Sequence, residues 1–221
     1  SGASVGNGLM DPEIQYAKFP DMAKPLVSPK VYDAMVASVP PCLRQIRACQ
    51  ALTRWWSIPV ASSAVCTAAV DYCNANLITP VQMTGVNWYD VREQCKFRPL
   101  CYDFSAIDAY LNRPDVRKAL GVPQLVKPWE ECSSSVHRRL TPDWMLNYIV
   151  DFPELLADKI PVLIYAGDTD YICNWIGNKA AALAMDWPGK AAFNEALDTD
   201  WLAGSGRVRS FGGFTFLQVF Q

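Results

Sequence analysis

Two carboxylates, Asp168 and Asp170, lie in a short loop directly after an apolar, β-branched run at 160–165. A run of this kind and length is typical of a strand that is buried on both faces of a sheet. The loop begins at Gly167, and a helical pattern follows over 175–185. Open α/β sheets present catalytic acids in such loops, at the carboxyl ends of their strands. An acid that only caps the following helix would give the same pattern, so both interpretations are open at this point.

The other residues that hydrolytic chemistry would need are poorly represented. His137 is the only histidine, and we interpret it as a surface residue beside Arg138 and Arg139, upstream of the acidic loop. Serines at 62–63 and 133–135 lie in polar contexts that suit helix caps and loops better than a nucleophile. We expect no cofactor and no metal, because the chain has a single histidine and no CxxC pair.

The composition argues against nucleic acids and membranes as binding partners. The 221 residues include 20 basic and 22 acidic side chains, for a net charge of −2. Without a basic stripe or tail, no nucleic-acid interface is expected. No apolar run approaches the roughly 18 residues of a membrane span, so no membrane contact is expected either. The first residues lack the features of a signal peptide and are typical of the interior of a longer protein.

Eight cysteines favour a disulfide-containing protein of an oxidising compartment: secretory, lysosomal or vacuolar. Cys42 and Cys49 are seven residues apart, as are Cys66 and Cys73. Seven residues make two helical turns, about 10 Å, which is too far for a bond within either pair. Two antiparallel helices, joined near 57–59, would instead match Cys42 to Cys73 and Cys49 to Cys66.

The remaining four cysteines are less constrained by their spacing. Cys95 and Cys101 enclose the short loop KFRPL and could close on each other. Cys132 and Cys173 are left, and the spacing suggests no partner for either.

Local patterns predict the elements that would carry these residues. Pro40 and Pro41 should split the helical pattern at 31–51 into two short helices. Gly212 and Gly213 should turn a β-hairpin at 208–220. The other segments are a Gly-punctuated loop over 5–16, a helix over 60–76, a loop-rich stretch over 77–104, two helices over 105–121, and a helical segment over 141–157 that begins at Thr141.

The order of these elements predicts a helical cap inserted into an α/β domain. Residues 1–24 would form the end of a strand and a loop of the core, and residues 25–132 the disulfide-braced helical cap. Residues 133–221 would then supply the C-terminal part of the core sheet. The expected fold class is therefore α/β.

Seven segments together resemble the serine carboxypeptidase family, in family order and across nearly the whole chain. They are VGNGLMDPEIQY at 5–16, CLRQIRAC at 42–49, NWYDVREQC at 87–95, LCYDFSAIDAYLNRPDVRKALGV at 100–122, DWM at 143–145, PVLIYAGDTDYICNWIGNKA at 161–180 and FTFLQVF at 214–220. The resemblance implies an α/β-hydrolase fold with a helical insertion. It also implies a Ser-His-Asp triad that releases C-terminal residues from peptides at acid pH.

The resemblance assigns roles to individual residues. Asp170 matches the triad acid, and Asp168 a structural acid of the same loop. The matched positions around the residue before the scissile bond are Ile172, Cys173 and Trp144; those around the leaving residue are Tyr89 and Tyr102, with Phe104 a weaker match.

The family arrangement also covers the cysteines. It contains the bonds Cys42–Cys73, Cys49–Cys66 and Cys95–Cys101. It implies that the partner of Cys132 lies upstream of this chain, and that Cys173 is a free thiol near the site.

Two parts of the family triad have no match in this sequence. A GxSxG nucleophile segment should precede the GNGL motif, and a histidine should follow the strand at 214–220. We therefore expect a partial sequence of an active carboxypeptidase that acts on peptides. A non-catalytic homologue and an acyltransferase of the same fold are the alternatives. A lysosomal, vacuolar or secreted location is expected, and a homodimer is left open.

Overall fold

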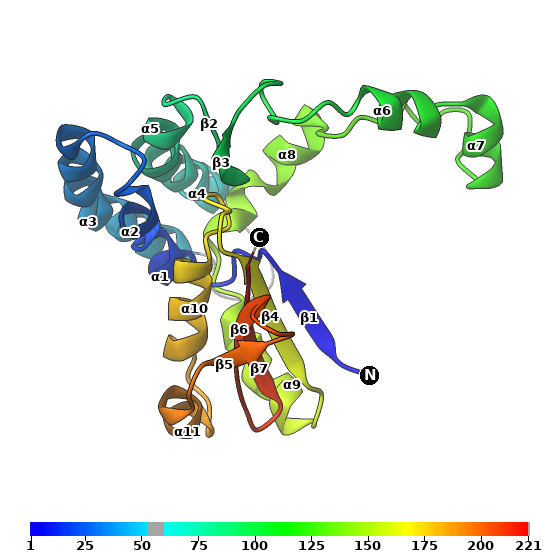
Figure 1. Cartoon of the computed structure of the whole chain (residues 1–221). Helices are drawn as coiled ribbons and strands as arrows, with labels where there is room; N and C mark the ends of the chain where they lie inside the picture. Colours follow the sequence, from blue (N-terminus) through cyan, green and yellow to red (C-terminus); the bar gives the residue numbers. More distant parts are fainter. Residues whose placement is uncertain (53–59, 221) are drawn as a thin grey trace.

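The computed structural model describes residues 1–52 and 60–220 (Figure 1). Its centre is a five-stranded sheet in the order β1-β4-β7-β6-β5. Strands β1, β4 and β7 run parallel, and β6 and β5 continue the sheet in antiparallel orientation. The strands are β1 (Ala3–Gly6), β4 (Val162–Gly167), β5 (Thr199–Trp201), β6 (Gly206–Phe211) and β7 (Phe214–Val219). This mixed sheet with flanking helices confirms the α/β class.

The hairpin predicted at the end of the chain is present. Phe211 of β6 pairs with Phe214 of β7. Between them Gly212 and Gly213 have φ angles of 54° and 87°. Positive φ at both central residues is the requirement of the tight two-residue turn that matches the twist of the strands, and glycine meets it without steric cost.

Helices cover one face of this sheet. Alternate residues of β4 and β7, among them Ile164 and Phe216, are buried there. They share one core with apolar residues of α9 (Phe152–Ala157), α10 (Trp175–Ala184) and α11 (Lys190–Glu195). On the opposite face Tyr165 is 40% exposed. The prediction that this strand is buried on both faces is wrong for the described part of the chain, because these helices cover only one.

A disulfide-braced helical layer lies above the sheet (Figure 1). Helix α3 (Pro29–Leu52) and helix α4 (Val60–Cys73) are joined by the bonds Cys42–Cys73 and Cys49–Cys66. These are the two pairs that the spacing of the cysteines predicted. The turn expected near 57–59 lies outside the described residues.

The predicted break at Pro40 and Pro41 is wrong, because α3 is one helix of 24 residues that contains both prolines. Each proline removes a backbone donor, which on its own costs enough to end a helix. Here the buried side chains Met35 and Ile46 anchor the two halves in the same core. Tertiary packing and the disulfides to α4 therefore outweigh the local preference.

Some predicted loops are ordered elements. Pro12–Tyr16 form α1 and Phe19–Ala23 form α2. Asp11 caps α1, with its Oδ1 accepting a 3.2 Å bond from the Ile14 amide. Beyond α4 the chain continues as the π-helix η1 (Asn74–Ile78) and α5 (Thr79–Gln82), before the antiparallel pair β2 (Val86–Asn87) and β3 (Asp90–Gln94).

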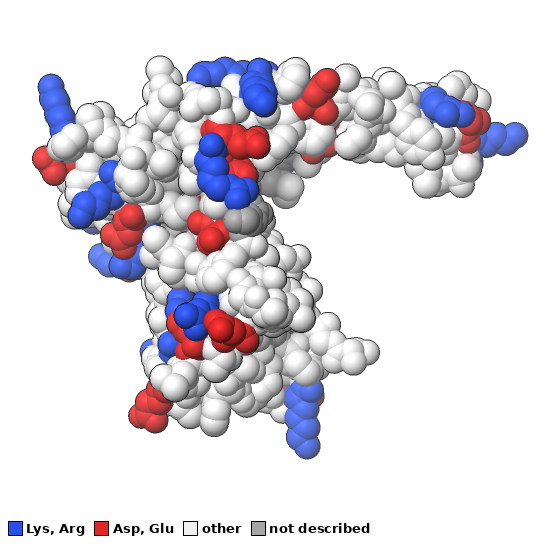
Figure 2. All heavy atoms as spheres, in the orientation of Figure 1, with Lys and Arg blue, Asp and Glu red and all other residues white. Residues whose placement is uncertain are grey.

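A long arm leaves the helical layer after the Cys95–Cys101 disulfide. It carries α6 (Ser105–Leu111) and α7 (Pro114–Ala119), as predicted, and returns to α8 (Ser134–Leu140). Figure 2 shows the arm projecting from the body, with basic and acidic side chains interspersed over this face of the molecule. No helix among the described residues is both long and apolar enough to cross a membrane.

The helical segment predicted from Thr141 is instead three short pieces. They are the 3₁₀ helices η2 (Thr141–Met145) and η3 (Ile149–Asp151), followed by α9. Met145 is fully buried in the core of the helical layer, and the Gln50 side chain of α3 donates a 3.0 Å bond to its carbonyl. The segment thus connects the helical layer to the sheet. The boundaries at residues 24 and 132 remain predictions.

Candidate active site

Three parallel strands end at the same edge of the sheet, next to the helical layer (Figure 1). The pairings Gly6–Tyr165 and Gly167–Val219 bring together the residues that follow β1, β4 and β7. The carboxyl edge of such a sheet is where α/β proteins bind ligands. The acidic loop follows β4 and therefore lies at this edge.

The hairpin of β2 and β3 holds the acidic loop by its backbone. The Trp88 carbonyl accepts bonds from the amides of Tyr171 and Ile172, at 3.0 and 3.2 Å. The Val91 amide donates to the Thr169 carbonyl at 3.0 Å. Tyr171 is fully buried and its hydroxyl donates to a carbonyl of the helical layer. The loop is therefore fixed between the two layers.

Asp170 is the buried acid of this loop, with 6% of its surface exposed. Its Oδ1 accepts a 3.0 Å hydrogen bond from the Cys173 amide. Burial raises its pKa to about 6, although backbone hydrogen bonds from Cys173 and Ile172 act in the opposite direction. Because ionising this buried carboxylate costs free energy, a cationic partner would stabilise its charged form more than that of an exposed acid.

Asp170 does not cap the helix that follows. Helix α10 begins after Asn174, whose Oδ1 accepts a 2.7 Å bond from the Gly177 amide. The capping interpretation of the acidic loop is therefore wrong for Asp170.

A first cavity of about 450 Å³ opens at Asp170. Tyr89 and Tyr102 line it, as does the weaker match Phe104. The rings of Tyr89 and Tyr102 are 6.0 Å apart, and those of Tyr102 and Phe104 6.4 Å. Burial is the main cause of a raised pKa at Tyr89. The residues predicted around the leaving residue thus form an aromatic wall beside the acid.

A second cavity of about 510 Å³ lies on the other side of Tyr89, which lines both. Ile172, Cys173 and Trp144 line the second cavity. Burial, followed by the charge of Asp170, raises the pKa of the Cys173 thiol to about 12. Cys173 is a free cysteine, as is the exposed Cys132. The structure therefore brings the predicted site residues together in two adjoining cavities.

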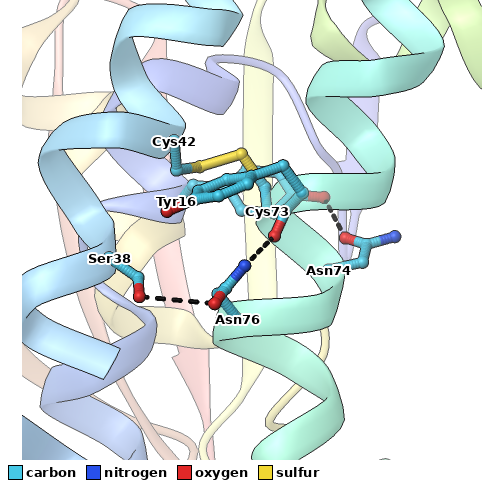
Figure 3. Close-up of a disulfide and its surroundings, with 7 residues drawn as sticks. Tyr16, Ser38, Cys42, Cys73, Asn74 and Asn76 are labelled. Carbon is cyan, nitrogen blue, oxygen red and sulfur yellow. Dashed lines mark hydrogen bonds between the residues drawn. A yellow bond between two sulfur atoms is a disulfide. The ribbon is translucent and has the colours of Figure 1, made fainter. Parts of the chain in front are cut away.

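The lining of the second cavity includes a pair of residues that the sequence patterns did not identify. Tyr16 of α1 donates a 2.7 Å bond to Oδ1 of Asn74, and both residues line the cavity. Figure 3 shows this pair next to the Cys42–Cys73 disulfide. Burial raises the pKa of the Tyr16 hydroxyl. The disulfide thus fixes the residue that precedes Asn74 in the chain.

Gln15 is a further residue that local patterns did not single out. Its Oε1 accepts bonds from the amides of Met10 and Asp11, at 2.7 and 2.8 Å. Its Nε2 donates to the Gly8 carbonyl at 2.7 Å. One buried side chain therefore holds the loop after β1 at the edge of both cavities.

Two exposed residues also reach the cavities. His137 was interpreted as a surface residue, and it is exposed, but its ring lies 4.8 Å from that of Trp144 and it lines the second cavity. Glu131 lines the first cavity. No local pattern marks either position. Within the described ranges, no group of three or more His, Cys, Asp or Glu side chains could hold a metal ion.

A model of the family described as serine carboxypeptidase matches residues 1–221. The chain belongs to the serine carboxypeptidase family. It is 39% identical to carboxypeptidase Y of Candida albicans over 98% of this chain and 40% of that protein. It is 37% identical to serine carboxypeptidase 3 of Triticum aestivum over 99% of this chain and 42% of that protein. The chain thus spans about two fifths of the length of these relatives.

A solved structure shows the same fold at lower sequence identity. Kex1(delta)p, a prohormone-processing carboxypeptidase from Saccharomyces cerevisiae, superimposes with a TM-score of 0.72 at 21% identity. The match covers 100% of this chain and 50% of that one. The α/β-hydrolase fold with a helical insertion, expected of this serine carboxypeptidase family member, is therefore confirmed.

Proposed function

We propose that this chain is part of a serine-type carboxypeptidase in which Asp170 is the triad acid. The observation that supports this most is a buried carboxylate at the end of a central strand, open to a cavity, with its pKa raised to about 6. In a triad the acid holds an imidazole in one tautomer and stabilises its protonated form. An imidazolium facing Asp170 would offset the cost of burying its charge.

The two cavities suggest how a peptide would bind. Its leaving C-terminal residue would occupy the cavity of Tyr89 and Tyr102. The preceding residue would occupy the cavity of Ile172, Cys173 and Trp144. Tyr89 lies between the two cavities, where the scissile bond would pass close to Asp170.

The nucleophilic serine and the catalytic histidine would come from other parts of the full-length protein. The chain spans about 40% of carboxypeptidase Y of Candida albicans, which leaves room for both. The three disulfides support an oxidising compartment, and we propose the vacuole, the lysosome or secretion. A homodimer stays a prediction, which sedimentation of the full-length protein would measure.

The proposed function is tested on the full-length protein with two reagents. A serine-directed fluorophosphonate should label it covalently, and a blocked dipeptide should lose its C-terminal residue. Labelling without release would favour an acyltransferase of the same fold. Neither labelling nor release by a folded, disulfide-bonded protein would identify a non-catalytic homologue and contradict the proposal.

A further inference from the structure

The first cavity combines an aromatic wall with negative charge. Glu131 lies on the return of the arm, one residue before Cys132, and lines this cavity together with Tyr102, Phe104 and Asp170. No lysine, arginine or histidine is among the described residues that line it. Of its two carboxylates, Asp170 is buried, whereas Glu131 is exposed.

Glu131 has no positively charged partner within the described part of the protein. The ion pairs there involve other acids, such as Asp90 with Arg92 and Asp115 with Arg113. Its carboxylate is therefore available to a ligand that enters the cavity. A cationic group there would gain a charge-assisted hydrogen bond from Glu131.

The aromatic wall favours the same kind of group. Tyr102 and Phe104 are in edge contact, with ring centroids 6.4 Å apart, and Tyr102 is 44% exposed. The faces of such rings attract cations. The aliphatic stem of lysine or arginine can also cover apolar surface while its charged end reaches a polar partner.

We propose that Glu131 is a specificity-determining residue that selects peptides with a C-terminal lysine or arginine. This inference rests on the proposed function, because it takes the first cavity as the site of the leaving residue. The charged end of that residue would pair with Glu131, and its stem would lie along Tyr102 and Phe104. An acidic leaving residue would be repelled by the same carboxylate.

The test measures kcat/KM of the full-length enzyme on blocked dipeptides that differ only in a C-terminal Lys or Leu. Glu131→Gln should lower the Lys-to-Leu ratio about two- to fivefold, since it removes an ion pair of an exposed carboxylate and leaves the aromatic wall. The loss should appear mainly in KM for the Lys substrate. Because salt screens charges, high salt should lower the Lys-to-Leu ratio of the wild type and leave that of Glu131→Gln unchanged.

Glu130→Gln is the matched control. It removes the same charge from the neighbouring residue, which is not among the residues that line the cavity. This control should keep the wild-type ratio. Glu131→Lys is a second variant, and it should shift the preference toward C-terminal Asp or Glu.

Two results would overturn the inference while leaving the proposed function intact. One is an active enzyme whose Lys-to-Leu ratio is the same in wild type and Glu131→Gln. The other is an equal decrease in Glu130→Gln, which would indicate a general charge effect. An enzyme that releases no C-terminal residue from either dipeptide would contradict the proposed function itself, and this inference with it.

Discussion

The helical layer and the sheet hold their shapes by different means. Two disulfides join α3 to α4, and the helix continues through Pro40 and Pro41. Among the described residues the sheet contains no disulfide and depends on strand register and on buried side chains such as Ile164 and Phe214. The sheet thus places Asp170 at a strand end, while the braced layer shapes the cavities around it.

We therefore expect the stability of the helical layer to depend strongly on its disulfides. Replacing Cys42 and Cys73 together by serine should lower the free energy of unfolding by about 3–4 kcal/mol, because the bond closes a long loop of the unfolded chain. Urea unfolding of the wild type and the variant measures this. Hydrogen exchange should accelerate in α3 and α4 more than in β4 and β7. Equal acceleration in both regions would show that the two layers do not differ in this way.

The buried acid predicts a pH dependence of stability in this chain. The folded state binds the Asp170 proton more tightly than the unfolded state, since its pKa rises from 3.8 to about 6. The stabilisation is therefore complete below about pH 4 and is lost as the pH rises through about 6. A shift of this size corresponds to roughly 3 kcal/mol in total, of which about 2 kcal/mol is lost between pH 4 and pH 7.

Asp170→Asn is the control for this slope, because asparagine does not titrate. The difference in unfolding free energy between wild type and variant should change by about 2 kcal/mol between pH 4 and pH 7, in favour of the variant at pH 7. Other acids with lowered pKa values, such as Asp198, contribute equally to both proteins. A difference that does not change with pH would contradict the burial of this charge.

A smaller loss of stability is expected from a substitution at Tyr16, where α1 contacts the helical layer. Tyr16→Phe removes the hydrogen bond to Asn74 and leaves its Oδ1 without that donor (Figure 3). The variant should lose about 1–2 kcal/mol of stability. Asn76→Ala in the same π-helix removes a bond to the Tyr72 carbonyl and one from the Ser38 hydroxyl. Asn76 is not among the described residues that line the second cavity, so this variant separates a local helix effect from the loss of the Tyr16–Asn74 bond in the cavity lining.

The sequence predicts features that depend on local spacing. The seven-residue spacing of cysteines led to the ladder between α3 and α4, and Gly212-Gly213 marked the hairpin turn. Strand, glycine, acid and helix in succession marked the acidic loop, and the family resemblance selected Asp170 within it. These features follow from helical and extended periodicity and from the backbone freedom of glycine.

The features that sequence reasoning missed depend on contacts between distant segments. The continuous α3 reflects packing and disulfides that override its prolines. Glu131 lines a cavity with Asp170 only because the arm returns to the end of the sheet. Tyr16 and Asn74 are 58 residues apart, so no local pattern relates them.

The most direct test of the account compares Asp170→Asn with Asp168→Asn in the full-length protein. The two acids lie in the same loop, but only Asp170 is among the described residues that line the first cavity. If Asp170 is the triad acid, its variant should lose about 10⁴-fold in kcat/KM on a blocked dipeptide while remaining folded. Asp168→Asn should retain most of the activity. A loss of less than tenfold in Asp170→Asn, or an equal loss in both variants, would contradict the assignment.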